Sequence, residues 1–215
     1  KWVLTDLLRE GEFPGGKEIL KRSLRGNLKY SEVFYELDKQ VQRLKDLGIN
    51  PTHFSGYQTK HLCPQVFKAA IDVSQKWNIN RMRTYNRLII WKGNVFSKIL
   101  FYYLGHPRHM LTHQYVSFLT WWAHSKGIST ADRAIAIGAV NPSDESSLKA
   151  WISMIQNLPE GINEIRVHPG YPDEELAKYS SYVKERRLEI QILTSEKVKQ
   201  SLSENDVELV SFKDI

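Results

Sequence analysis

The sequence predicts an α/β fold built on a mainly parallel sheet. Amphipathic helical segments alternate with short strand-like segments, and polar residues follow the ends of the predicted strands. Alternation of this kind is typical of βαβ units, whose functional loops gather at the carboxyl ends of the strands. We expect about four or five strands, fewer than a closed eight-stranded barrel requires. Either the sheet is open, or part of a barrel lies upstream of Lys1.

The composition favours one domain over residues 1–215 and excludes several classes of protein. The chain has 215 residues, of which 41% are hydrophobic, enough for one sizeable core. Cys63 is the only cysteine, which excludes an internal disulfide and fits a reducing cytoplasm. No apolar run approaches the ~20 residues that cross a bilayer, so we expect a cytoplasmic protein without a membrane segment. The 30 basic residues are spread among 24 acidic ones, which favours a mixed solvated surface over a nucleic-acid interface.

Helices dominate the first half of the predicted structure. The clearest begins near Ser31, a suitable N-cap, and ends at Gly48, a residue suited to the left-handed conformation that follows a helix. A second helix follows Pro64 and ends at Asn78 or Asn80. The other helices predicted before residue 126 are 17–25, 95–104 and 111–125.

The second half alternates between strands and helices. Ser143-Asp144-Glu145 caps a helix that stops at Pro159, and Pro172-Asp173-Glu174 begins another. Ile165 and Val167 alternate with polar residues, as in a strand whose end presents His168. The remaining predictions are strands within 81–90, 128–140 and 207–212, a helix over 195–202, and a segment, 188–193, whose periodicity fits either.

Aromatic residues form a stripe on the predicted helix 111–125. Tyr115, Phe118, Leu119 and Trp122 recur there at helical spacing. A stripe of this kind more often packs in a core or at a subunit interface than against a ligand. We therefore expect it in the core or in a homodimer contact.

The motif at His168-Pro169-Gly170 is the first candidate for chemistry. Proline restricts the backbone after the histidine and glycine allows a turn, so the imidazole would be held at a rigid corner. An imidazole titrates near neutral pH and can therefore donate or accept a proton during a reaction. Asp173 is close enough in sequence to orient the ring. A structural turn with a hydrogen-bonded histidine is the alternative interpretation.

The segment 51–64, PTHFSGYQTKHLCP, is the second candidate. It lies between two strong helices and contains His53, Tyr57 and His61. Imidazoles at this density suggest Zn²⁺ or a similar ion, although the segment has no carboxylate to complete a metal site. Arg83, which follows a predicted strand, would bind an anionic or polyhydroxyl ligand or lie as a surface charge. His109 and His113 lack the glutamate of a zinc-protease helix, so a polar helix face is the better interpretation.

Three segments together resemble the YdjC-like carbohydrate deacetylases. The run from Leu37 to Arg83 resembles that family's helix, P-T-H-x-D-S-H-x-H-x-H-x-x-P loop and strand end. EIRVHPGYPDEEL is similar to its H-P-G-Y-x-D segment, and the last 30 residues to its final helices and strand. The resemblance implies an incomplete or irregular β/α barrel-like fold, in a single domain without the family's N-terminal strands.

The resemblance also implies a reaction and a set of roles. The reaction is hydrolysis of the acetyl amide of an N-acetylated sugar, such as a chitooligosaccharide, with Mg²⁺ or Zn²⁺ as the cofactor. By position, His168 and Asp173 match the catalytic histidine and aspartate, and Arg83 matches a residue on the substrate. In the loop, His53 and His61 match family histidines, so Tyr57 and His53 are expected to contact the substrate and His61 the metal.

The loop departs from the family pattern at three positions. Ser55 replaces the aspartate, while Tyr57 and Thr59 replace two histidines. A neutral tyrosine is a poor ligand, and the loss of a metal ligand costs more than the ~10- to 100-fold of a change beside one. Three functions therefore remain: a carbohydrate deacetylase, an inactive relative that binds a sugar or a partner protein, and a basic nucleic-acid-binding module that shows no known motif.

Overall fold

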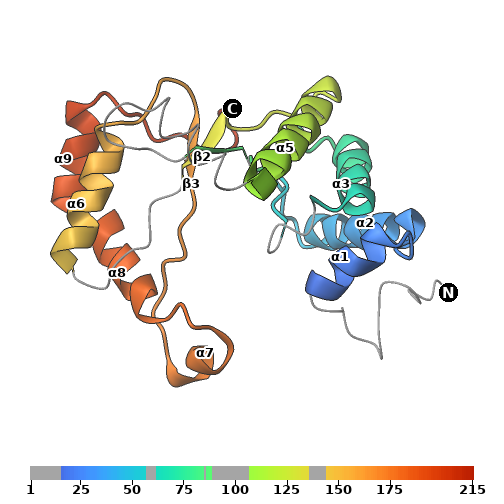
Figure 1. Ribbon diagram of the computed structural model, residues 1–215, viewed down its shortest axis with the longest axis horizontal. Coiled ribbons are helices and arrows are strands. Elements are labelled where there is room, and N and C mark those ends of the chain that lie inside the picture. Colours follow the sequence, from blue (N-terminus) through green and yellow to red (C-terminus); the bar gives the residue numbers. More distant parts are fainter. Residues whose placement is uncertain (1–15, 57–61, 85, 89–106, 136–143) are drawn as a thin grey trace. The chain divides into compact units, whose positions relative to one another are not determined.

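The computed structural model describes residues 16–56, 62–84, 86–88, 107–135 and 144–215 (Figure 1). The chain divides into two compact units, each assembled from separate stretches. Unit 1 comprises Lys1–Arg83, Leu111–Thr130 and Phe212–Ile215, and unit 2 comprises Thr84–Met110 and Ala131–Ser211. Within the described ranges, no helix combines the length and the apolar character needed to span a bilayer.

Unit 1 is mainly helical over its described residues. Its helices are α1 (Gly16–Leu24), α2 (Tyr30–Asp46), α3 (Pro64–Trp77) and most of α5 (Pro107–Ser125) (Figure 1). The two helices that the sequence predicted most clearly, α2 and α3, are confirmed. Gly48 and Asn78 follow them with φ of +76° and +55°, left-handed conformations that end each helix. The N-cap of α2 is Lys29 rather than Ser31, because the helix already begins at Tyr30.

The core of unit 1 forms where α2, α3 and α5 pack together. Ile71 and Val73 on α3 have no exposed surface, and Leu119 on α5 is 3% exposed. The aromatic stripe predicted on α5 is therefore divided between two environments. Leu119 packs in the core as expected, whereas the Phe118 side chain is 54% exposed.

Polar contacts fasten α2 to α3 beside this core. The Asp72 carboxylate accepts hydrogen bonds from the Tyr30 hydroxyl and the Lys68 ammonium group, each at 2.5 Å. Burial raises the pKa of the Asp72 carboxyl, but these two bonds outweigh it and hold the pKa below its usual value. Further along, the Trp77 indole donates to Asp38 at 2.8 Å.

Unit 2 contains a parallel three-stranded sheet, which confirms the predicted α/β class. The strands are β1 (Arg87–Leu88), β2 (Arg133–Ile135) and β3 (Asn163–Ile165), in the order β1-β2-β3. Ala134 pairs with Arg87 on one side and with Glu164 on the other. The strands are short: of the residues predicted as strand, 89–90 and 136–140 lie outside the described ranges.

Helices of unit 2 build the second core, although one of them, Glu174–Tyr179, has no buried residue. They are α6 (Asp144–Ile155), α7 (Glu174–Tyr179), α8 (Lys184–Leu193) and α9 (Glu196–Glu204) (Figure 1). Trp151, Ile155, Leu188 and Ile192 from α6 and α8 share this core with Val198 from α9. The segment 188–193, which fitted a strand or a helix, is therefore helical.

The closing strand predicted over 207–212 is wrong, since no ladder forms there. The Val207 amide donates to the Leu202 carbonyl at 2.9 Å, and Asp206 has φ of +52°. These residues therefore close α9 instead of starting a strand. Beyond them Leu209 is 80% and Val210 51% exposed, so these two apolar residues face solvent rather than a core.

Candidate functional site

His168 lies three residues beyond the end of β3, on an exposed part of the chain. Its imidazole meets the edge of the Tyr182 ring, with centroids 5.8 Å apart and planes at 64°. Helix α8 holds the backbone around it. The His168 amide donates to the Glu189 carboxylate, and the Arg186 guanidinium donates to the His168 carbonyl at 3.5 Å. The imidazole is thus accessible while its backbone is tied to a helix.

The His168-Pro169-Gly170 corner is rigid for a different reason from the one expected. Gly170 has no left-handed φ, and a Cβ there would meet the Arg186 side chain at 3.8 Å, an ordinary contact. Instead, the Gly170 amide donates to the Arg186 carbonyl at 3.3 Å. Hydrogen bonds to α8, rather than a glycine-only conformation, therefore fix the corner.

Asp173 is the N-cap of α7. Its carboxylate accepts a hydrogen bond from the Leu176 amide at 2.8 Å, which satisfies one of the free donors at the helix start. Within the described residues, no hydrogen bond or ion pair joins it to His168. Its catalytic role stays a prediction, and the capping role is what the contacts show.

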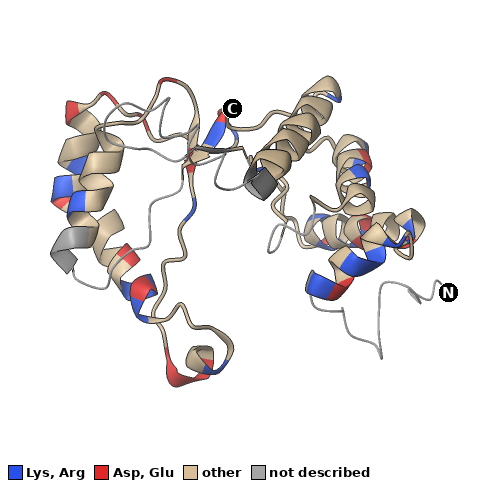
Figure 2. Cartoon of the chain, viewed as in Figure 1, with Lys and Arg blue, Asp and Glu red and all other residues tan. Residues whose placement is uncertain are grey.

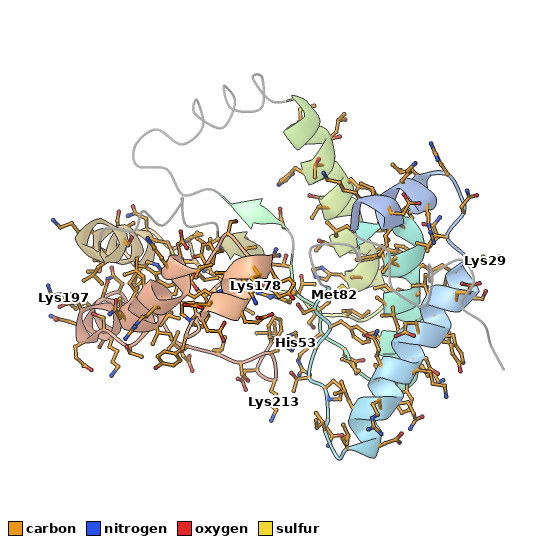
Figure 3. All side chains as sticks on the ribbon, turned by 90° about the horizontal axis from the view of Figure 1, so that it is seen from below. Lys29, His53, Met82, Lys178, Lys197 and Lys213 are labelled. Carbon is orange, nitrogen blue, oxygen red and sulfur yellow. The ribbon has the colours of Figure 1, made fainter. Side chains whose placement is uncertain are left out.

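His53 and Arg83 belong to unit 1, on neighbouring extended segments. A parallel bridge pairs Phe54 with Met82, and the Arg83 amide donates to the Phe54 carbonyl at 3.0 Å. Figure 3 shows His53 near the segment that carries Met82. The His53 ring stacks on Phe212 at 3.8 Å, which covers one face of the imidazole. Both residues are half-buried, and their contact with a substrate stays a prediction.

The structure does not complete a metal centre within the ranges it describes. Tyr57 and His61 lie outside the described residues, as does Thr59. The described His, Cys, Asp and Glu side chains form no group of three that could hold an ion. Among the loop residues that the structure describes, His53 offers a metal ion one imidazole ligand, and one face of that ring is stacked on Phe212. The described residues therefore do not fit the implied Mg²⁺ or Zn²⁺ site.

Comparison with known proteins identifies the family. The model of the YdjC-like protein family matches residues 2–204, nearly the whole chain. The chain belongs to the YdjC-like family. The resemblance seen in the histidine loop and the His-Pro-Gly motif is thereby confirmed.

Several relatives of this YdjC-like chain carry names that state an activity. It is 25% identical over 207 residues to a carbohydrate deacetylase of Geobacillus stearothermophilus, covering 95% of this chain and 66% of that protein. It is 24% identical over 182 residues to a carbohydrate deacetylase of Thermoanaerobacter pseudethanolicus, covering 84% and 59%. The chain thus spans less than two thirds of the length of these relatives.

A solved structure supports the fold. A crystal structure of an Enterococcus faecalis V583 protein, assigned to cellobiose-phosphate cleavage, superposes with a TM-score of 0.66. The match covers 98% of this chain and 69% of that one, at 20% identity. At this identity the likeness shows the fold of a YdjC-like chain and nothing finer.

Sequence analysis missed two carboxylates that are buried in the described part of unit 2 of this YdjC-like chain. On β3, Glu164 is 9% exposed and accepts a hydrogen bond from the Thr84 amide at 3.0 Å. Arg166 pairs with Glu164 at 3.4 Å and donates to the Thr84 carbonyl at 2.6 Å. Glu164 and Arg166 therefore hold both backbone groups of Thr84. The alternation of the predicted strand placed Glu164 on the solvent side, so the sequence carried no sign of its burial.

The second missed carboxylate, Glu189, is 4% exposed and lies between apolar residues of α8. It binds the Tyr182 hydroxyl in addition to the His168 amide. Burial, followed by this hydrogen bond, raises the pKa of the Tyr182 phenol well above its usual range, so the group stays a neutral donor. A charged residue inside the apolar run LEIQIL was the signal in the sequence.

A cavity of about 510 Å³ lies elsewhere in unit 1, and none of the predicted site residues lines it. Basic residues of α1 and of the turn after it dominate its lining. Figure 2 shows positions of Lys and Arg in blue on α1. Lys21 and Arg22 lie in the last turn of α1, where positive charge stabilises the helix dipole. Its lining residues are Glu18, Lys21, Arg22, Arg25, Gly26, Asn27 and Lys29.

Proposed function

We propose that this chain hydrolyses the acetyl amide of an N-acetylated sugar such as a chitooligosaccharide. The curated relatives named carbohydrate deacetylases support the substrate class. The single observation that carries the proposal is the corner at His168, an exposed imidazole on a backbone fixed by α8. An imidazole held in this way can act as a general acid that protonates the leaving amine.

The other predicted residues enter this proposal with narrower roles. Arg83, Tyr57 and His53 would contact the sugar, and Asp173 would act beside His168. His61 stays the predicted metal ligand, but the described residues do not assemble a Mg²⁺ or Zn²⁺ site, so we assign no step to a metal. We also propose that the parallel strands belong to a single cytoplasmic domain with the barrel-like fold that the family resemblance implies.

A second function has its own support. Ser55 and Tyr57 stand where the family loop has an aspartate and a histidine, so the loop offers weaker ligands than its relatives do. An inactive relative would bind the carbohydrate, or a partner protein, through the same residues without turnover. The two functions differ in whether acetate is released.

Acetate release from N-acetylglucosamine oligomers tests the proposal directly. We expect turnover by the full chain and, because acid–base groups contribute about 10²- to 10⁴-fold, a loss of that size for His168→Ala. The matched control is His124→Ala, since His124 is an exposed histidine of α5 that bonds Thr130. Turnover that survives in His168→Ala would refute the acid–base assignment. Oligomer binding without acetate release, with or without added Mg²⁺ or Zn²⁺, would establish the second function instead.

A further inference from the structure

We propose that α8 positions the imidazole of His168, with Glu189 and Arg186 as the positioning residues. The chemical consequence rests on the proposed function, whereas the geometry does not. Glu189 and Arg186 lie three residues apart, on the same side of one helical turn. From there they reach both polar groups of a single peptide residue outside the helix.

Helix α8 supplies both hydrogen-bond acceptors and a hydrogen-bond donor to the backbone around His168. The Glu189 carboxylate accepts from the His168 amide, and the Arg186 guanidinium donates to the His168 carbonyl. The Arg186 main-chain carbonyl also accepts from the Gly170 amide. Three hydrogen bonds to one helical turn therefore fix the corner before and after the proline, and only the side-chain torsions of His168 remain free.

Tyr182 restricts the ring itself. Its hydroxyl donates to the other oxygen of the Glu189 carboxylate, and its ring packs edge-to-face with the imidazole, the two ring centroids being 5.8 Å apart. The Arg186 guanidinium holds the same residue from the backbone side, donating to the Tyr182 carbonyl at 2.9 Å. The buried Glu189 carboxylate thus holds both the backbone of His168 and the Tyr182 ring that packs against its imidazole.

The cost of burying Glu189 argues that this arrangement serves the exposed histidine. Glu189 is 4% exposed and lies on α8 next to the buried Leu188 and three residues before the buried Ile192, so its carboxylate carries a desolvation cost that an apolar side chain would not. Its two oxygens bond to the His168 amide and to the Tyr182 hydroxyl. A misplacement of ~1 Å can cost about 10²-fold in rate, so an acid–base imidazole gains from such anchors.

The experiment compares Glu189→Met, Glu189→Gln and Glu196→Met in the full chain. Methionine removes both acceptors at similar size, glutamine keeps one acceptor for the amide, and Glu196 is a control on α9 with a side chain 84% exposed. We expect Glu189→Met to speed hydrogen exchange of the His168 amide about 10- to 100-fold, the factor for a hydrogen bond to a charged group. It should also shift the imidazole titration seen by NMR and lower kcat about 10- to 100-fold at unchanged KM.

Each outcome decides the proposal. Recovery of exchange, titration and kcat in Glu189→Gln, with the control like wild type, supports it. Wild-type exchange and titration in Glu189→Met, or a change in KM alone, overturns it. Should Glu189→Met not fold, Tyr182→Phe keeps the ring and removes its hydroxyl, and an unshifted imidazole titration there overturns the proposal equally. A wild-type chain without deacetylase activity refutes the proposed function, while the two NMR measurements still decide the positioning role.

Discussion

Replacing Glu164 with alanine is expected to destabilise unit 2 more than any surface substitution. The change removes the acceptor of the Thr84 amide and the partner of Arg166 at once. Thr84 is 1% exposed, so water cannot replace the lost bond. The Arg166 guanidinium would lose the carboxylate beside it, although it would still donate to the Thr84 carbonyl.

The magnitude follows from burial. Breaking a buried ion pair by removing one partner costs about 3–5 kcal/mol. The Arg166 side chain is 22% exposed and can recover some hydration, which favours the lower end, about 3 kcal/mol. Glu164→Gln keeps an acceptor for the Thr84 amide and loses only the charge, so we expect about 1–2 kcal/mol.

Urea unfolding followed by ¹⁹F NMR of 5-fluorotryptophan measures this effect in the right part of the chain. Trp151 is buried in the core of unit 2 and reports on it directly. Glu196→Ala, on the exposed face of α9, is the matched control and should change stability by less than about 0.5 kcal/mol. An unfolding midpoint for Trp151 in Glu164→Ala that equals the control's would refute the reasoning.

Three further predictions concern unit 1. Ile71→Ala should lower the free energy of unfolding by about 2–5 kcal/mol, measured in urea, because Ile71 has no exposed surface. The Asp72 pKa is lowered in the folded state, so its contribution is complete above its unfolded pKa of about 4 and is lost as pH falls through the folded value. Urea midpoints from pH 7 to pH 3 should therefore fall less steeply in Asp72→Asn than in the wild type. Phe212→Ala should speed modification of His53 by diethyl pyrocarbonate, detected by mass spectrometry, and an unchanged rate would contradict the shielding by the stacked ring.

The sequence predicted the helices of unit 1 because local rules decide them. The glycine at 48, the proline at 64 and the asparagine at 78 each fix a backbone conformation by their own chemistry. The strand predicted near residue 210 was wrong because alternation alone does not supply a core. Val207 and Leu209 alternate with polar residues as in a strand, but they follow a helix cap, and Leu209 is 80% exposed while Val207 packs against the core of unit 2.

The candidate site also has features that the local sequence predicts and features that it does not. The accessibility of His168 could be predicted from a strand end followed by proline. The helix that holds it could not, because the contacts join residues 18 to 21 positions apart and 188–193 showed no clear period. Asp173 was placed correctly at a helix start, yet its hydrogen bond goes to the helix rather than to the imidazole.

The division of the chain has a consequence for how the protein is made and handled. Unit 1 takes residues from both ends of the sequence and from its middle, so the polypeptide passes from one unit to the other four times. Neither unit can be obtained by cutting the gene at a single boundary. During synthesis, α2 and α3 leave the ribosome well before Phe212, so His53 gains its stacking partner only at a later stage. A nascent chain stalled before that point would keep this part of unit 1 unfinished and exposed to proteases.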